Sequence, residues 1–202
     1  YVGRYGSGAL AIRDGGEVMS DSGVIGEGYD STGVVMVSGS GSRWRNTGGV
    51  VFAPDEQSAG SPEPGVGGLI VGYDGHGGLE ITDGGSVSST HGYIGHHAES
   101  VAMVLVSGVG SNWSNSDELR VGFYSVGGST WPDSPPELPH ASVPGLPPHF
   151  SAKSRLEITD GGLVENTYGY VGSERASAGW VTVSGVDSTW ANSGQVCIGN
   201  SG

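Results

Sequence analysis

Four histidines lie close together in the sequence, and Glu99 follows them: His76, His91, His96 and His97. Imidazole and carboxylate groups are ligands for transition metals, so this cluster could hold an ion such as zinc. The spacing supports this weakly, because adjacent residues such as His96 and His97 point to opposite faces of an extended strand. We therefore expect polar surface here, with no bound metal and no cofactor.

Three aspartates each precede a pair of glycines: Asp14, Asp83 and Asp160. Such a row could bind calcium or supply a catalytic carboxylate pair. If its members lie two layers apart in a stack of strands, their separation is about 10 Å, outside the roughly 6.5–9.5 Å window of an inverting glycosidase. Asp before Gly-Gly is typical of a tight turn with positive φ, so we interpret these aspartates as turn residues.

Two further residue types recur at fixed places. They are the tryptophans Trp44, Trp113 and Trp190, and the asparagines Asn46, Asn115 and Asn192. Indole faces could form a stacking platform for sugar rings. Each tryptophan is flanked by polar or small residues, however, so strand alternation directs the indole into the core. The asparagines are expected to bind backbone groups at a corner.

Other catalytic patterns are missing from the sequence. No Ser/His/Asp arrangement, phosphate-binding loop or Cys-x-x-Cys motif occurs in a context that supports chemistry. The polar residues on the expected strands are mostly short. We therefore expect no set of carboxylates and basic residues to converge on one exposed face.

These residues are positioned by a repeat. The segment 79–85, LEITDGG, recurs at 156–162 and in weaker form at 10–16, while Val-Gly pairs set a period of 50 residues. Repeat units are expected at about 2–51, 71–121 and 150–198, with insertions at about 49–67 and 129–152. A fixed period of this kind indicates a solenoid.

The repeat is expected to be a strand-and-turn structure. All ten prolines lie in the insertions, which indicates that the repeated part is continuous hydrogen-bonded sheet. Apolar residues alternate over short stretches bounded by Gly, Ser, Asn and Asp, and no window has a helical stripe. Each unit divides into two halves of about 25 residues, and each half is expected to contain three short strands. We therefore predict an all-β parallel β-helix, or β-solenoid, of about six three-strand coils with two proline-rich loop insertions.

Composition narrows the function. Forty glycines are too many for an ordinary layered domain, but the apolar alternation and five tryptophans argue against disorder. The net charge of −13 makes nucleic acid and anionic membranes unsuitable partners. Cys197 is the single cysteine, and no signal peptide or membrane-spanning apolar run is present. The chain begins and ends within the repeat, so we interpret it as a segment of a longer solenoid.

The segment 181–194 reads Val-x-Val-Ser-Gly-x-x-Ser-x-Trp-x-Asn-Ser-Gly. Joined to Leu-x-Ile-x-Asp-Gly-Gly-x-Val and Gly-Tyr-Ile/Val-Gly, it resembles repeats in the passenger domains of bacterial autotransporter adhesins. The resemblance covers nearly all of the chain outside the insertions. It implies a right-handed parallel β-helix exported to the bacterial cell surface.

The insertions are the least repetitive parts. Both are expected to leave the coil at the same corner and so to lie on one edge of the rod, where solenoids often carry binding loops. Within the second, a candidate contact loop mixes aromatic, proline, leucine and charged residues: Trp131, Pro132, Asp133, Glu137, Leu138, His140 and Phe150. An equally supported alternative is that this loop has no binding role.

The sequence favours a non-enzymatic extracellular or cell-surface structural and adhesive segment. Expected partners are other copies of the chain or neighbouring solenoid coils, and a host-surface or carbohydrate ligand, without direct membrane insertion. The alternative is a β-helix enzyme acting on polysaccharide, as a lyase or a glycoside hydrolase. Ice binding is disfavoured, because the threonine row that it needs is interrupted at Arg13, Met36 and Leu105.

Overall fold

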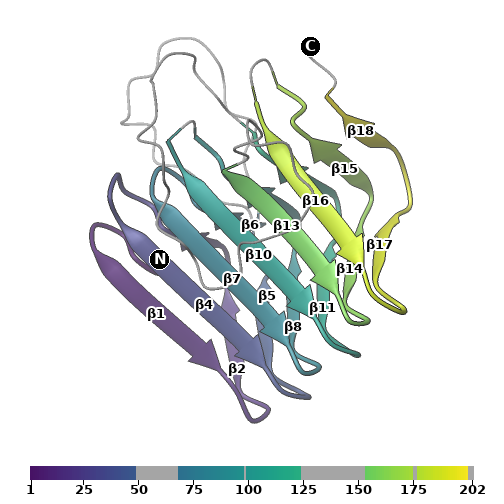
Figure 1. Ribbon diagram of the computed structural model, residues 1–202. Helices are drawn as coiled ribbons and strands as arrows, with labels where there is room; N and C mark the ends of the chain where they lie inside the picture. Colours follow the sequence, from purple (N-terminus) through teal and green to yellow (C-terminus); the bar gives the residue numbers. More distant parts are fainter. Residues whose placement is uncertain (49–67, 98, 124–152, 175–176, 200–202) are drawn as a thin grey trace.

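The computed structural model describes residues 1–48, 68–97, 99–123, 153–174 and 177–199. Over these residues the chain forms strands and turns, arranged as three all-parallel sheets of six strands each (Figure 1). None of the described residues belongs to a helix that could span a bilayer. The predicted right-handed parallel β-helix of six three-strand coils is confirmed.

Each coil contributes one strand to each sheet. The first sheet contains β1 (Ser7–Ile12), β4 (Thr32–Ser38), β7 (His76–Thr82), β10 (Val101–Ser107), β13 (Ser154–Thr159) and β16 (Gly179–Ser184). The second contains β2 (Glu17–Ser20), β5 (Arg43–Asn46), β8 (Ser86–Ser89), β11 (Asn112–Asn115), β14 (Leu163–Asn166) and β17 (Thr189–Asn192). The third contains β3 (Gly23–Ile25), β6 (Gly68–Val71), β9 (His91–Ile94), β12 (Glu118–Val121), β15 (Tyr168–Val171) and β18 (Val196–Ile198).

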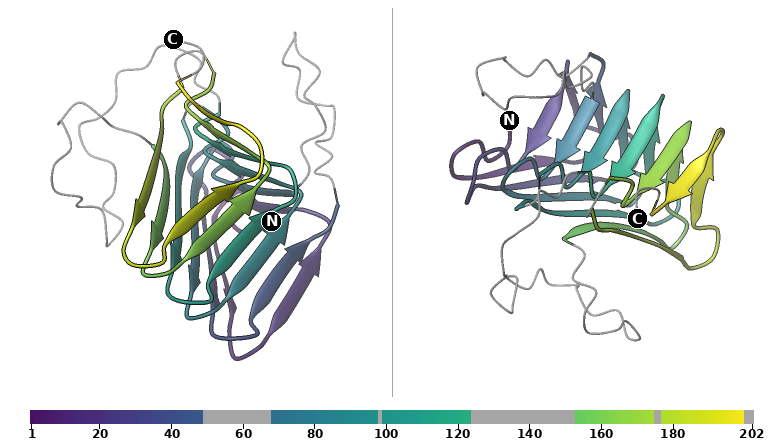
Figure 2. Two further views of the ribbon diagram at one scale, coloured as in Figure 1. Left: turned by 90° about the vertical axis from the view of Figure 1, so that its right-hand side faces the viewer. Right: turned by 90° about the horizontal axis from the view of Figure 1, so that it is seen from above.

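Strands of successive coils stack along the rod (Figure 2), and their pairing register places equivalent residues in rows. The leucine that opens each of the segments 10–16, 79–85 and 156–162 lies in the row Leu10, Val35, Leu79, Val104, Leu156 and Val181. The four central members of that row are at most 1% exposed. Strand alternation thus directs every second residue into one narrow apolar column between the three sheets.

The two-coil period follows from side-chain size. One row of the second sheet alternates Val18, Trp44, Val87, Trp113, Val164 and Trp190. The facing row of the third sheet alternates Gly23, Leu69, Gly92, Leu119, Gly169 and Val196. Each indole lies against the glycine of the preceding coil, where no side chain competes for the space. Large and small residues therefore complement each other within each 50-residue unit.

The two insertions leave the coil at different corners, so the prediction of a shared corner is wrong. The first follows β5 and precedes β6, which pairs with β3 and β9 in the third sheet. The second follows β12 and precedes β13, at the corner between the third and first sheets. The sequence misled because β6 (Gly68–Val71), the last strand of the second coil, is separated from the rest of its coil by the insertion.

The last described coil presents apolar side chains at the end of the rod. Val183, Val196 and Ile198 are 45%, 42% and 74% exposed, and the outer edges of β16, β17 and β18 have no neighbouring strand among the described residues. At the opposite end, Val2 pairs with Ile25 and extends the third sheet by one bridge.

Candidate functional site

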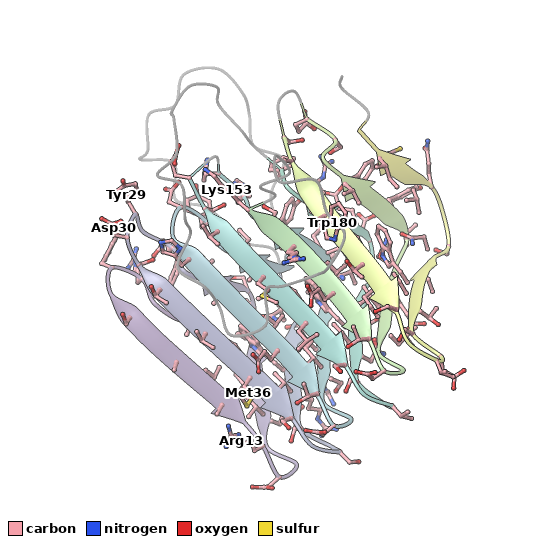
Figure 3. The ribbon with its side chains drawn as sticks, viewed as in Figure 1. Arg13, Tyr29, Asp30, Met36, Lys153 and Trp180 are labelled. Carbon is pink, nitrogen blue, oxygen red and sulfur yellow. The ribbon has the colours of Figure 1, made fainter. Side chains whose placement is uncertain are left out.

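The outer faces of the three sheets differ in chemistry. On the first sheet, the central outward residues are mainly apolar or hydroxyl-bearing; Met36, for example, accepts a hydrogen bond from Arg13 at one end of this face (Figure 3). On the second sheet, the central strands β8 and β11 present short polar residues such as Ser88 and Ser114. All three faces carry charged side chains, such as the Arg155–Glu157 pair of the first sheet and the group of Glu17, Arg43 and Arg45 on the second. The third sheet combines a charged centre with several tyrosines.

The outward row of the third sheet runs Val24, Ile70, Tyr93, Arg120, Tyr170 and Cys197. A second outward row pairs Glu118 of β12 with Tyr168 of β15. These side chains point outward because their strand neighbours, such as Leu119 and Val121, are fully buried in the core. We call Tyr93, Glu118, Arg120, Tyr168, Tyr170 and Glu174 the third-sheet face.

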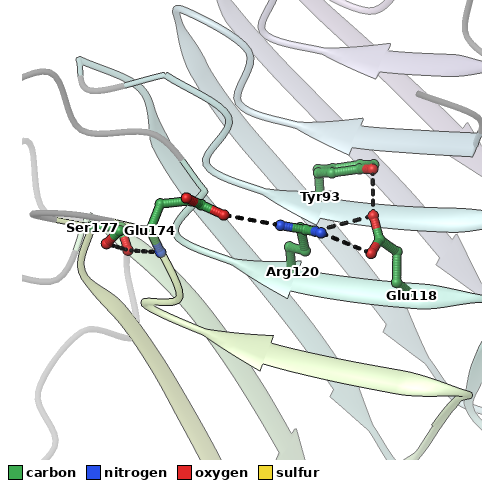
Figure 4. A network of polar contacts seen from close by, with 5 residues as sticks. All are labelled: Tyr93, Glu118, Arg120, Glu174 and Ser177. Carbon is green, nitrogen blue, oxygen red and sulfur yellow. Dashed lines mark hydrogen bonds and ion pairs between the residues drawn. The ribbon is translucent and has the colours of Figure 1, made fainter. Parts of the chain in front are cut away.

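Arg120 is the centre of this face (Figure 4). Its Nη2 donates to Oε2 of Glu118 at 3.0 Å, and its Nη1 donates to Oε1 of Glu174 at 3.3 Å. The hydroxyl of Tyr93 donates to Oε1 of Glu118 at 2.7 Å. Ser177 fixes the turn that carries Glu174, because its hydroxyl accepts from the Glu174 N–H at 3.0 Å and donates to the Glu174 carbonyl at 2.7 Å.

Aromatic rings hold the guanidinium in place. Its Cζ lies 4.8 Å from the ring centroid of Phe123 and 4.7 Å from that of Tyr170, both suitable for cation–π attraction. The side chains of Arg120 and Glu118 are 21% and 18% exposed, whereas Glu174 is 45% exposed and Tyr168 is 42% exposed. A rigid charged centre is thus bordered by an accessible carboxylate and an accessible phenol.

The surroundings of Glu118 and Arg120 favour the charged form of both side chains. Burial alone would raise the pKa of Glu118, but hydrogen bonds from Arg120 and Tyr93, together with nearby positive charge, lower that pKa below its usual value. Burial also opposes the charge on Arg120, yet Glu118 raises the pKa of the guanidinium. Both groups are ionised at neutral pH. A glycosidase acid requires the opposite shift, so this arrangement suits recognition better than proton transfer.

Two members of the histidine cluster, His96 and His97, form part of an aromatic ladder beside this face. The His96 ring is stacked on Tyr73 at 4.9 Å and tilted against Phe123 at 5.2 Å. Burial, followed by the proximity of His97, lowers the pKa of His96 to about 3. His96 therefore serves as a neutral ring in this ladder. Among the described residues, no group of three or more His, Cys, Asp and Glu side chains is placed to hold a metal ion.

His91 joins the same group of rings through Tyr93, whose ring centroid lies 5.8 Å from that of His96. Its Nε2 is 3.2 Å from Oδ2 of Asp117, and its ring stacks on Tyr93 at 6.5 Å. It thus borders the third-sheet face from the next strand.

The tryptophan row lies inside the coil. Trp44 and Trp113 are 4% and 0% exposed, while Trp190, in the last coil, is partly buried. Each indole N–H donates to the preceding coil: Trp44 to Ser20 at 3.0 Å, Trp113 to Ser89 at 3.2 Å, and Trp190 to Asn166 at 2.8 Å.

The asparagine row is joined to the tryptophans through these same acceptors. Ser20 donates to Asn46 at 2.7 Å, Ser89 to Asn115 at 2.6 Å, and Asn166 to Asn192 at 2.5 Å. These hydrogen bonds involve side chains, whereas the sequence suggested backbone groups. The asparagines thus continue an internal polar ladder beside the indoles.

The aspartate row occupies left-handed backbone positions, with φ of 54° at Asp14 and Asp83 and 53° at Asp160. The glycine after each has positive φ as well. This conformation is the tight turn between the first and second sheets, where an L residue other than Asp or Asn is strained.

Two sequence expectations have different outcomes. The candidate contact loop, Trp131, Pro132, Asp133, Glu137, Leu138, His140 and Phe150, lies outside the described residues. The expectation that no carboxylates and basic residues converge on one face is wrong, because Glu118, Arg120 and Glu174 do so. The sequence pattern that could have indicated this group is Glu118-x-Arg120, in which two charged residues flank the inward-facing Leu119. The pair occurs once and does not recur with the repeat.

Comparisons of this chain with known protein families, with curated proteins and with solved structures found no match.

Proposed function

We propose that this chain is a non-enzymatic structural and adhesive segment of an extracellular or cell-surface β-helix, and that it binds carbohydrate through the third-sheet face. The observation that carries the proposal is the Arg120 centre, clamped by Glu118 and Glu174 and bordered by Tyr168 and Tyr170. Fixed carboxylates accept hydrogen bonds from sugar hydroxyls, and tyrosine rings pack against sugar C–H groups.

The rod supports this role by its rigidity. Six coils in register form a stiff scaffold, on which the side chains of the third-sheet face keep fixed spacings. Partners with exposed phosphates are disfavoured by the net charge of −13. The resemblance of the repeat to autotransporter adhesin passengers supports placement at a bacterial cell surface.

We also propose that the exposed end of the rod is covered by further coils. A strand added beside β16, β17 and β18 would pair their free edges and bury Val183, Val196 and Ile198. This strand can come from the same protein or from another copy of the chain.

The alternative is an enzyme acting on polysaccharide through the same face. The lowered pKa of Glu118 and its engagement by Arg120 disfavour it as the general acid of a glycoside hydrolase.

A microarray of neutral and acidic polysaccharides separates the two functions. The chain should be retained on a subset of the glycans without releasing new reducing ends or unsaturated products. Release of such products would establish the enzymatic alternative, and absence of retention on every glycan would contradict carbohydrate binding.

A further inference from the structure

The positive charge of Arg120 is engaged within the third-sheet face. Glu118 binds the guanidinium with both oxygens: Nε lies 3.0 Å from Oε1, and Nη2 donates to Oε2 at 3.0 Å. Nη1 donates to Oε1 of Glu174 at 3.3 Å, and the rings of Phe123 and Tyr170 pack on the guanidinium. Two carboxylates thus oppose one guanidinium, so this group carries net negative charge.

The carboxylate of Glu174 is accessible to a ligand. Its side chain is 45% exposed, and its Oε1 receives the hydrogen bond from Arg120. Ser177 holds the main chain of the turn that presents it, as Figure 4 shows. Because Arg120 already restrains the carboxylate, a charge-assisted hydrogen bond from a ligand N–H costs little further side-chain freedom.

A second accessible carboxylate borders the opposite end of the face. Asp117 precedes β12, whereas Glu174 follows β15, and these two strands are parallel. The Asp117 side chain is 49% exposed, with Oδ2 3.2 Å from Nε2 of His91. The Asp117 carbonyl accepts from the N–H of Tyr168 at 3.2 Å, so Asp117 and the exposed Tyr168 are neighbours in adjacent coils.

This arrangement favours a ligand with repeated positive charges. Ammonium groups donate to carboxylates and are attracted to the faces of tyrosine rings. One ammonium group cannot reach both Asp117 and Glu174, because β12 alone, four residues long, extends about 10 Å between them. Acidic polysaccharides are repelled by both carboxylates, and neutral ones form no ion pair with either. The net charge of −13 adds long-range attraction for a cationic polymer.

We propose that the third-sheet face binds a polysaccharide with free amino groups, such as a polymer of glucosamine, in preference to neutral and acidic polysaccharides. This inference rests on the proposed carbohydrate-binding function and names the ligand class. Ammonium groups of the polymer bind Asp117 and Glu174 at the two ends of the face. Tyr168 packs against a sugar ring beside Asp117.

Two oligosaccharides with the same backbone test the ligand class. They are the hexamers of β-1,4-linked glucosamine and N-acetylglucosamine, titrated calorimetrically into the full chain slightly below neutral pH, where the amines are protonated. The glucosamine hexamer should bind about five- to tenfold more tightly, as two exposed ion pairs permit. Its affinity should fall as salt is added, because salt screens exposed charges.

The outcomes separate the ligand class from carbohydrate binding itself. If the N-acetylated hexamer or a galacturonic acid hexamer binds as tightly as the glucosamine hexamer, the inference is wrong while carbohydrate binding stands. Failure of the glucosamine hexamer to bind would also overturn the inference, and the polysaccharide microarray would then decide separately on carbohydrate binding.

Charge-neutralising variants test the two carboxylates. Glu174→Gln and Asp117→Asn each remove one charge and keep the side-chain shape. Each should weaken binding of the glucosamine hexamer about two- to fivefold without changing that of the N-acetylated hexamer. Glu165→Gln is the matched control, since it removes an exposed charge on the second sheet and should leave binding unchanged. Equal weakening in all three variants would assign the attraction to the net charge of the rod and overturn the role of this face.

A lysine hexamer separates recognition of an amino sugar from attraction of charge alone. It should bind more weakly than the glucosamine hexamer, and Tyr168→Ala should weaken glucosamine binding, because the phenol ring packs against the sugar. If the lysine hexamer binds equally well and Tyr168→Ala leaves glucosamine binding unchanged, the face recognises a basic peptide and the proposal is overturned.

Discussion

The indole of Trp113 occupies the space that a side chain on Gly92 would need, since a Cβ built on Gly92 would lie 2.8 Å from its Cζ2. The same relationship joins Trp44 to Gly23 and Trp190 to Gly169. It explains why the repeat contains two coils: one supplies the large ring and the other supplies the space.

Replacing Trp113 with alanine should leave a large void in the column. Trp113 is fully buried, so we expect Trp113→Ala to lower the free energy of unfolding by about 3–5 kcal/mol. Denaturant unfolding followed by circular dichroism measures this loss. An unchanged midpoint would place the indole outside the core.

Adding a methyl group to the glycine partner should also destabilise the rod. Gly92→Ala would bring a Cβ to 2.8 Å from both Trp113 and Leu119, with an expected cost of about 1–3 kcal/mol. Gly6→Ala is the matched control, since nothing lies within 4 Å of its added Cβ. Pairing Gly92→Ala with Trp113→Val should cost less than the sum of the single changes. Additive costs would show that the two positions do not compete for space.

Protonation of His96 should weaken the fold in mild acid. Burial lowers the pKa of His96 to about 3 in the folded chain, whereas its ordinary value is 6.5. Between these values the unfolded chain binds the additional proton. Stability is therefore lost as the pH falls below about 6.5, with a slope approaching about 1.4 kcal/mol per pH unit from this one group.

His96→Phe should remove that part of the pH dependence, because phenylalanine already occupies the equivalent ladder position at Phe123. The measurement is the free energy of unfolding of both proteins across this pH range. Parallel curves would mean that His96 does not titrate with unfolding.

The isolated chain should self-associate through its last coil. Ile198 is 74% exposed beside the unpaired edge of β18. Sedimentation of the chain should show concentration-dependent association, and Ile198→Asp should reduce it, since a charge on an edge opposes strand addition. A monomer at all concentrations, or an Ile198→Asp variant that associates equally, would refute axial stacking.

The sequence predicted the coil well because the coil is repetitive. The recurrence of LEITDGG, the alternation around Val104 and the confinement of proline each reflect the same stacked geometry. The corner at which the first insertion leaves the coil was predicted wrongly, because Gly68–Val71 is a short strand without apolar–polar alternation and is separated in the sequence from the rest of its coil. The third-sheet face could not be predicted from the repeats. Arg120 occupies the same position as Tyr93 and Tyr170 in the neighbouring coils, so it looks like ordinary variation at one repeat position.

The central claim, that the third-sheet face binds carbohydrate, is tested most directly by binding of two tyrosine variants to the polysaccharide microarray. Tyr168→Ala removes an exposed ring on this face, whereas Tyr29→Ala removes a ring that is 75% exposed elsewhere. We predict that Tyr168→Ala loses retention by at least about tenfold, equivalent to about 1.4 kcal/mol, and that Tyr29→Ala binds as the unaltered chain does. Equal retention of both variants would contradict the assignment of this face.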